Sequence, residues 1–148
     1  MDTANIEDKL KNKKIRPTAM RLLVYNLLQE KQQAISLTDI ETAFLTDESL
    51  SIPVDRTTIY RTVKTFEKKG VVHAIEEGSG IVKYALCDND CDDEHHSDMH
   101  LHFYCTSCQK TFCLTDHKIP KVALPNNYKV LELSLMAKGI CEDCNKDN

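Results

Sequence analysis

The apolar residues in the first part of the chain recur with the spacing of amphipathic helices. Asn5–Lys14 is polar and rich in lysine, and it predicts a short helix. After Pro17, Thr18 suits a helix N-cap, and the next apolar residues are Met20, Leu23, Leu27 and Leu28. Ser36-Leu37-Thr38-Asp39 approximates a capping box, with Asp in place of the usual Glu, and predicts the start of the next helix.

A third long helix is predicted between Pro53, which stops the preceding segment, and Gly70, which suits the C′ position. Asp55 can cap it, and its inward-facing residues are Ile59, Val63 and Phe66. The outward-facing residues are then Arg56, Thr57, Tyr60, Arg61 and Lys64. Such side chains can contact DNA phosphates and base edges. On periodicity alone, an ordinary solvated helix face is the alternative.

After this helix the period of the pattern changes from that of a helix to that of a strand. Residues 71–75 and 81–85 alternate like two strands, and residues 76–80 contain two glycines suited to a hairpin turn. Three helices followed by a β-hairpin is the order of elements in a winged helix.

The remaining part of the chain predicts a small sheet. His100–Tyr104 alternates like a strand, residues 111–114 could be its partner, and residues 128–137 suggest a long strand. Pro120 and Pro125 leave room for about one helical turn between them. The long strand would place a row of leucines on one face: Leu131, Leu133 and Leu135. Because a sheet this small needs a staple or a partner, the row suggests dimerisation as well as a core.

Two C-x-x-C pairs carry the strongest chemical signal in the sequence. They are Cys105–Cys108 and Cys141–Cys144, and two such turns can close a tetrahedral zinc site with four cysteine ligands. Two disulfides or a redox C-x-x-C are the alternatives. The chain has seven cysteines in total, an odd number that suits a reducing cytoplasm better than a disulfide framework. The lysine-rich start has no apolar leader and no apolar run reaches membrane length, so we expect a cytoplasmic zinc protein with no membrane partner.

Charge is distributed unevenly along the 148 residues, although the net charge of −4 is ordinary for a soluble protein. Residues 9–21 contain lysines and arginines without an acid, whereas residues 88–98 contain acids without a lysine or arginine. The basic front and the acidic middle indicate two halves with different partners.

With these residues in hand, the sequence resembles the ferric uptake regulator family of metal-responsive repressors. The matching segments are Arg16-Pro17-Thr18-x-x-Arg21, Thr58-Ile59-Tyr60-Arg61-Thr62-Val63-x-x-Phe66-x-x-x-Gly70-Val71-Val72, and His100-x-His102-x-x-Cys105-x-x-Cys108, closed by the distal C-x-x-C. The resemblance implies an α+β chain with two domains, a DNA-binding winged helix at residues 1–86 and a metal-binding α/β dimerisation domain at residues 87–148. It further implies a homodimer that binds a palindromic, AT-rich operator when it carries its regulatory metal. It also implies that the third helix reads bases, while Arg16 and Arg21 contact phosphates or the minor groove.

Within this family, the candidate regulatory site is similar to that of the zinc uptake regulator branch. Its candidate ligands are His73, Cys87, His102 and Cys113, with His100 as the alternative imidazole. Thiolates with imidazoles suit tetrahedral Zn(II) better than an oxygen-rich iron site. The early-hinge histidine of some iron and peroxide sensors corresponds to Ala34 here. We expect one structural and one regulatory Zn(II) per subunit, and an iron- or peroxide-responsive repressor is the alternative. Taken singly, each cysteine could be an inert buried thiol.

Enzymes and simple interaction modules are the competing classes. The C-x-x-C turns do not open a helix in a βαβ unit, as a thioredoxin-like site requires, and no H-E-x-x-H segment supplies a hydrolytic zinc. We therefore expect no enzymatic activity and no small-molecule substrate. A zinc-ribbon interaction module with an unrelated helical half would have no operator, so DNA binding with and without a chelator separates it from a repressor of metal-uptake genes.

Overall fold

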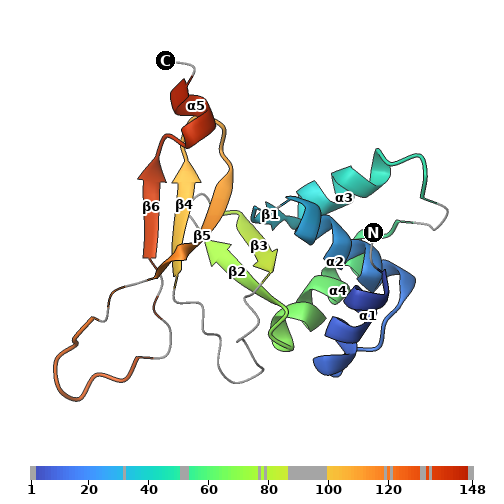
Figure 1. Ribbon diagram of the computed structural model, residues 1–148, viewed down its shortest axis with the longest axis horizontal. Coiled ribbons are helices and arrows are strands. Elements are labelled where there is room, and N and C mark those ends of the chain that lie inside the picture. Colours follow the sequence, from blue (N-terminus) through green and yellow to red (C-terminus); the bar gives the residue numbers. More distant parts are fainter. Residues whose placement is uncertain are drawn as a thin grey trace.

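The computed structural model has an α+β fold in which a helical half with a small sheet is followed by a second sheet (Figure 1). This confirms the predicted fold class, although the short strand Ile35–Ser36 and the helix Glu142–Lys146 were not predicted. The structure describes residues 3–31, 33–50, 54–76, 78, 80–86, 100–118, 120, 122–130, 133 and 135–146.

The helical half consists of α1 Thr3–Asn12, α2 Ala19–Lys31, α3 Leu37–Leu45 and α4 Arg56–Lys68. Local capping defines the helix starts as predicted. The Ser36 hydroxyl accepts a hydrogen bond from the Asp39 N–H at 3.1 Å, and Asp39 accepts one from the Ser36 N–H at 3.3 Å, so both halves of the capping box are present. The Asp55 carboxylate accepts from the Thr57 N–H at 3.2 Å and caps α4.

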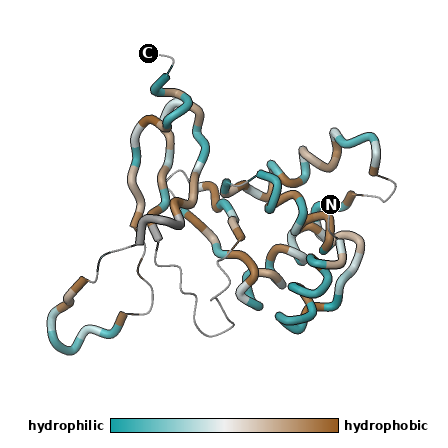
Figure 2. The backbone as a smooth tube through the Cα atoms, viewed as in Figure 1, coloured by the Kyte–Doolittle hydropathy of each residue, from teal (hydrophilic) through white to brown (hydrophobic). Residues whose placement is uncertain are grey.

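These helices pack around one apolar core. Apolar and polar stretches alternate along their path in Figure 2, which is the pattern that buries one face of each helix. Fully buried residues of this core are Leu10, Val24, Ile40, Ile59, Val63 and Phe66. The Phe66 ring meets Tyr25 edge-on, with ring centroids 6.4 Å apart. The inward face predicted for the third helix is therefore confirmed.

The first sheet has the strand order β1-β3-β2, with β1 Ile35–Ser36, β2 Val72–Glu76 and β3 Val82–Leu86, all antiparallel. Gly78 and Gly80, in the connection between β2 and β3, have φ values of +94° and +85°, which glycine adopts without strain. Tyr84 and Val72 join the helical core, whereas Ile75 and Ala85 belong to a separate buried cluster. Both faces of this sheet are thus covered, one by the helices and the other by the C-terminal half.

The second sheet has the order β5-β4-β6, with β4 His100–Cys105, β5 Thr111–Lys118 and β6 Leu135–Gly139, followed by α5 Glu142–Lys146. Strand β4 pairs with β5 in antiparallel fashion and with β6 in parallel. No described residue from 122 to 124 is helical, so the predicted helical turn between the two prolines is wrong.

The predicted long strand at residues 128–137 is also wrong in its bounds. The strand begins at Leu135 and runs to Gly139, and residues 128–130 and 133 are not in a strand. The physical reason is the register, because Leu135 pairs with Leu101 near the start of β4, and earlier residues would extend beyond their partner strand. Leu135 is 41% exposed in the single chain, while Leu131 lies outside the described residues.

The two halves meet where β1 and β3 approach β5. The Ala34 N–H donates to the Thr111 carbonyl at 2.9 Å, forming an isolated antiparallel bridge. The predicted boundary between residues 86 and 87 falls at the edge of the described chain and stays a prediction. Within the residues that the structure describes, no helix is long and apolar enough to cross a membrane.

Candidate metal centres and DNA-binding face

The four cysteines of the two C-x-x-C pairs come together at one end of the second sheet. Strand β4 ends at Cys105 and the turn continues to Cys108, while Cys141 directly precedes α5 and Cys144 lies within it. The four sulfur atoms all lie within 4.8 Å of one another. The buried Cys105 sulfur accepts hydrogen bonds from the N–H groups of Cys108 and Cys141, each at 3.4 Å. We call this group the four-cysteine cluster.

The spacing of these sulfur atoms fits a tetrahedral zinc ion. With Zn–S bonds of about 2.3 Å, two ligands of a tetrahedral ion lie about 3.8 Å apart. The Cys108 and Cys141 sulfurs are 3.8 Å apart. A disulfide would instead require a separation of about 2.05 Å, and all four cysteines are free thiols. The four-cysteine cluster therefore fits a zinc site better than the predicted alternative of two disulfides.

The thiols of this cluster are unequal. Hydrogen bonding from the Cys108 N–H, with smaller contributions from those of Cys141 and Ser107, lowers the pKa of Cys105 to about 6. The Ser107 hydroxyl lowers the pKa of Cys144, but the neighbouring thiols, led by Cys141, outweigh it and raise the pKa to about 12. The cluster thus favours a thiolate at Cys105, and binding a metal through all four sulfurs would release protons from the others.

A second group of possible ligands lies between the two halves. It consists of His73 on β2, His102 on β4 and Cys113 on β5, and their ligand atoms lie within 4.8 Å of one another. His73 and His102 are buried, and Cys113 is half-buried. Because His102 and Cys113 are register partners in the antiparallel pair, their side chains leave the same face of the sheet.

The distances within this group also fit a tetrahedral ion. The Nε2 atoms of His73 and His102 are 3.3 Å apart, and the Cys113 sulfur is 3.9 Å from His73 Nε2. Tetrahedral zinc, with Zn–N bonds of about 2.0–2.1 Å and a Zn–S bond of about 2.3 Å, would place these pairs about 3.3–3.4 Å and about 3.6 Å apart. Two imidazoles and one thiol could therefore hold one Zn(II) with little movement.

Two further predicted ligands are not placed in this cluster. Cys87 lies outside the described residues, so its role as a ligand stays a prediction. His100 starts β4, and its backbone pairs with Lys118, but its side chain is not described. Ala34 packs near Cys113 in the small buried cluster and offers no ligand atom there.

The outward face of α4 carries the five residues predicted to contact DNA. All of them are exposed, namely Arg56, Thr57, Tyr60, Arg61 and Lys64. Tyr60 is 48% exposed, and the Lys64 ammonium lies 5.5 Å from the centre of its ring. Arg56 and Lys64 also form ion pairs with Glu41 and Glu67, at 4.0 Å and 3.5 Å. Exposed ion pairs of this kind contribute little to stability.

The two predicted arginines before and in α2 lie next to each other. The Arg21 guanidinium donates to the Arg16 carbonyl at 2.9 Å, and the Arg21 N–H donates to the Thr18 hydroxyl at 3.3 Å, as expected for an N-cap. Arg16 is exposed and Arg21 is half-buried. This contact holds the Arg21 side chain against the backbone of Arg16 at the entry to α2.

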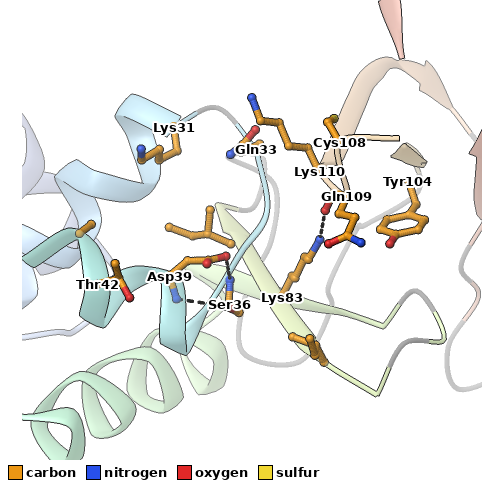
Figure 3. Close-up of a pocket in the computed structure, with 13 residues that line it drawn as sticks. Lys31, Gln33, Ser36, Asp39, Thr42, Lys83, Tyr104, Cys108, Gln109 and Lys110 are labelled. Atoms are coloured by element: carbon orange, nitrogen blue, oxygen red, sulfur yellow. Dashed lines mark hydrogen bonds between the residues drawn. The ribbon is translucent and has the colours of Figure 1, made fainter. Parts of the chain in front are cut away.

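Sequence reasoning missed the polar contacts that join the two halves. Lys83, the second residue of β3, is buried, and its ammonium donates to the Gln109 carbonyl at 2.7 Å and to the Thr111 hydroxyl at 3.1 Å. Figure 3 shows Lys83 reaching Gln109 beside Tyr104, at a cleft of ≈ 660 Å³ that Ser36 also lines. The apolar character of both faces of residues 71–75 was the one available signal that the sheet is covered on both sides.

Comparison with known proteins identifies the family. The model of the family described as "Ferric uptake regulator family" matches residues 12–138. The chain belongs to the ferric uptake regulator family.

Similar relatives are the ferric uptake regulation proteins of Bordetella parapertussis (strain 12822), 26% identical over 95% of this chain and 96% of the relative, and of Neisseria meningitidis serogroup A, 28% identical over 97% and 96%. Among solved structures, a zinc uptake regulator complexed with zinc and DNA has a TM-score of 0.70 at 20% identity, over 98% of this chain and 93% of that one. The Vibrio cholerae ferric uptake regulator has a TM-score of 0.61 at 19% identity, over 91% and 98%.

Family membership makes this chain a metal-responsive transcriptional regulator and confirms that it is not an enzyme. The two solved structures, at these identities, show the fold alone. Membership in the zinc uptake regulator branch is not decided by the comparisons, because the named relatives are ferric uptake regulation proteins while the similar structures include both kinds of regulator.

Proposed function

We propose that this protein is a Zn(II)-dependent repressor that binds palindromic, AT-rich operators as a homodimer in the cytoplasm and controls metal-uptake genes. The observation that carries this proposal is the cluster of His73, His102 and Cys113 between the two halves. Its donor groups are a thiol and two imidazoles, and its members lie on β2 of the first sheet and on β4 and β5 of the second.

The ligands of this cluster come from both sides of the junction. His73 lies on β2, directly after the helix that is proposed to read DNA, whereas His102 and Cys113 lie on the second sheet. A metal ion bound to all of them would favour the closed arrangement of the two halves. The two imidazoles are buried, the Cys113 thiol is half-buried, and the three ligand atoms already converge, so little rearrangement is needed to hold this arrangement. To shift the ratio of closed to open molecules from 1:99 to 99:1, the metal must bind the closed arrangement more tightly than the open one by about 5.5 kcal/mol.

The donor atoms favour zinc over iron as the sensed metal. Thiolate and imidazole ligands suit tetrahedral Zn(II), whereas carboxylate-rich octahedral sites suit harder ions. We assign Cys87 as the fourth ligand, with His100 as the alternative imidazole to His102. A second zinc would be held by Cys105, Cys108, Cys141 and Cys144 and would have a structural role.

The DNA contacts are assigned to the exposed face of α4 and to the entry of α2. Tyr60 and Arg61 would contact bases or neighbouring phosphates, aided by Arg56, Thr57 and Lys64. Arg16 and Arg21 would contact phosphates or the minor groove. A homodimer would present two such faces to one palindromic site, and the exposed Leu135 of β6 is available for the subunit contact.

An iron- or peroxide-responsive repressor of the same family is the second candidate. The observation that favours it is that the similar curated relatives are ferric uptake regulation proteins. The half-buried thiol of Cys113 and the absence of a ligand atom at Ala34 favour zinc instead.

Operator binding in defined metal buffers tests whether the protein responds to zinc or belongs to the iron- or peroxide-responsive class. The protein, prepared with only its structural zinc, is titrated against an operator selected from a random AT-rich library, with fluorescence anisotropy as the readout. We expect buffered trace Zn(II) to restore tight binding. Cys113→Ala should abolish this response while one zinc per subunit and the oligomeric state are retained. Activation by Fe(II) or Mn(II) without a response to trace zinc would overturn the zinc assignment and support the second candidate.

A further inference from the structure

A buried lysine joins the two halves at a point separate from the candidate metal ligands. Lys83 is 8% exposed, and its ammonium donates to the Gln109 carbonyl at 2.7 Å and the Thr111 hydroxyl at 3.1 Å. The same ammonium lies 5.2 Å from the centre of the Tyr104 ring, which favours a cation at that position. All three contacts cross from β3 of the helical half to the second half, and Figure 3 shows those with Gln109 and Tyr104.

Thr111 receives a second contact from the helical half. Its side chain is fully buried, and its carbonyl accepts a hydrogen bond from the Ala34 N–H at 2.9 Å. Thr111, at the start of β5, therefore contacts both Ala34, which precedes β1, and Lys83 on β3. Two positions further along the same strand is Cys113, and Ile75, the register partner of Lys83, lies two positions after His73. The Lys83 contact thus lies beside the candidate regulatory site on both sides of the junction.

The acceptor of the shorter bond is held by the cysteine turn. Gln109 follows Cys108 and has a φ of +63°, which a non-glycine residue adopts only when its surroundings require it. Its N–H donates to the Cys105 carbonyl at 2.9 Å, and the Cys105 N–H donates to the Lys110 carbonyl at 3.0 Å. The turn that carries half of the four-cysteine cluster therefore also directs the Gln109 carbonyl towards Lys83.

We infer that Lys83 is a positioning residue that stabilises the closed arrangement of the two halves without contacting the sensed metal or DNA. This inference rests on the proposed function. When only a fraction of the molecules is closed, the apparent dissociation constant of the metal equals the intrinsic constant divided by that fraction. Each contact that favours closure therefore lowers the metal concentration needed for operator binding. The Lys83 contact also makes this concentration depend on an intact cysteine turn.

Lys83→Met tests the inference, because Met keeps the packing volume and removes the charged donor. We expect the Zn(II) concentration at half-maximal operator binding to rise roughly tenfold or more, the scale of a hydrogen bond made by a charged donor. Operator affinity at saturating Zn(II) should be unchanged, because the metal then drives closure on its own. Lys110→Met is the matched control, because Lys110 is exposed at the same cleft. Its loss should not change the Zn(II) concentration at half-maximal operator binding, which we call the midpoint.

A second variant guards against a merely structural effect. Thr111→Val removes the hydroxyl that accepts from Lys83 and keeps the carbonyl that accepts from Ala34. It should shift the midpoint in the same direction, and the double variant should shift it by less than the product of the two single effects. An unchanged midpoint in Lys83→Met, an equal loss of operator affinity at saturating Zn(II), or fully independent effects of the two changes would overturn the inference. If the wild-type protein shows no response to Zn(II), the proposed function fails instead.

Discussion

Replacing Cys108 by serine should unfold the C-terminal half while leaving the helical half folded. Cys108 is exposed, so the change to the similar serine creates no packing defect and removes only a candidate zinc ligand. The C-terminal half has little else to stabilise it. From residue 100 to residue 146, the buried side chains among those that the structure describes are His102, Cys105, Thr111 and Cys141. None of these is a large aliphatic or aromatic residue.

The magnitude follows from this lack of an apolar core. Structural zinc contributes about 10–16 kcal/mol in small zinc-dependent folds, as much as the whole stability of a typical domain, about 5–15 kcal/mol. The stability lost with one zinc ligand should therefore exceed the stability that the β4–β5 and β4–β6 pairing can supply in one chain. The helical half retains the cluster around Val24, Val63 and Phe66, which contains no cysteine, and should still unfold cooperatively.

Zinc content by mass spectrometry and amide hydrogen exchange test this prediction. In Cys108→Ser the structural zinc should be lost. The amides of β4 should lose protection, while those of α2 and α4 keep theirs, and the dimer should be lost in gel filtration. Cys113→Ser is the matched control, because it removes a thiol outside the four-cysteine cluster and should retain structural zinc, protection and dimer. A Cys108→Ser protein with one tightly bound zinc, a normal dimer and unchanged protection of β4 would refute the reasoning.

Two further substitutions test the helical half. Tyr60→Ala should weaken specific operator binding by about 1–3 kcal/mol, because Tyr60 is exposed on the face of α4 assigned to base contacts; Lys68→Ala, exposed at the end of the same helix, is the control, and unchanged affinity of Tyr60→Ala in anisotropy titrations would disprove the assignment. Phe66→Ala should lower the free energy of unfolding by about 3–5 kcal/mol in urea denaturation, because the ring is fully buried against Tyr25. A loss below about 1 kcal/mol would show that α4 does not pack as described.

Local rules were sufficient to predict the helical half and the two C-x-x-C turns. The capping box at Ser36, the cap at Asp55 and the buried stripe of Ile59, Val63 and Phe66 each depend on residues within one or two helical turns. The two C-x-x-C turns were predictable for the same reason, because the gap within each pair is local, whereas their meeting in one cluster was inferred from the four ligands of tetrahedral zinc. In such segments the sequence contains nearly all of the determining interactions.

Pairing between distant segments could not be derived in the same way. The start of β6 depends on where β4 begins, because the two are parallel and paired from Leu101 and Leu135 onward, and the leucine pattern before Leu135 contains no information about that limit. The role of Lys83 depends on a carbonyl and a hydroxyl that lie 26 and 28 positions away. A lysine in a strand normally indicates a solvated face, and only the covering second sheet makes it buried.

The register of β4 and β5 makes the candidate regulatory site depend on the four-cysteine cluster, whereas the four-cysteine cluster does not depend on the regulatory site. His102 and Cys105 lie on the same strand, and β4 continues into the first cysteine turn of the four-cysteine cluster. The pairing of His102 with Cys113, which brings two candidate ligands to one face, therefore requires the hairpin that this cluster closes. His73 comes from the other half and has no part in that hairpin. Loss of the structural site should consequently abolish the regulatory site, whereas loss of a regulatory ligand should leave the structural site occupied.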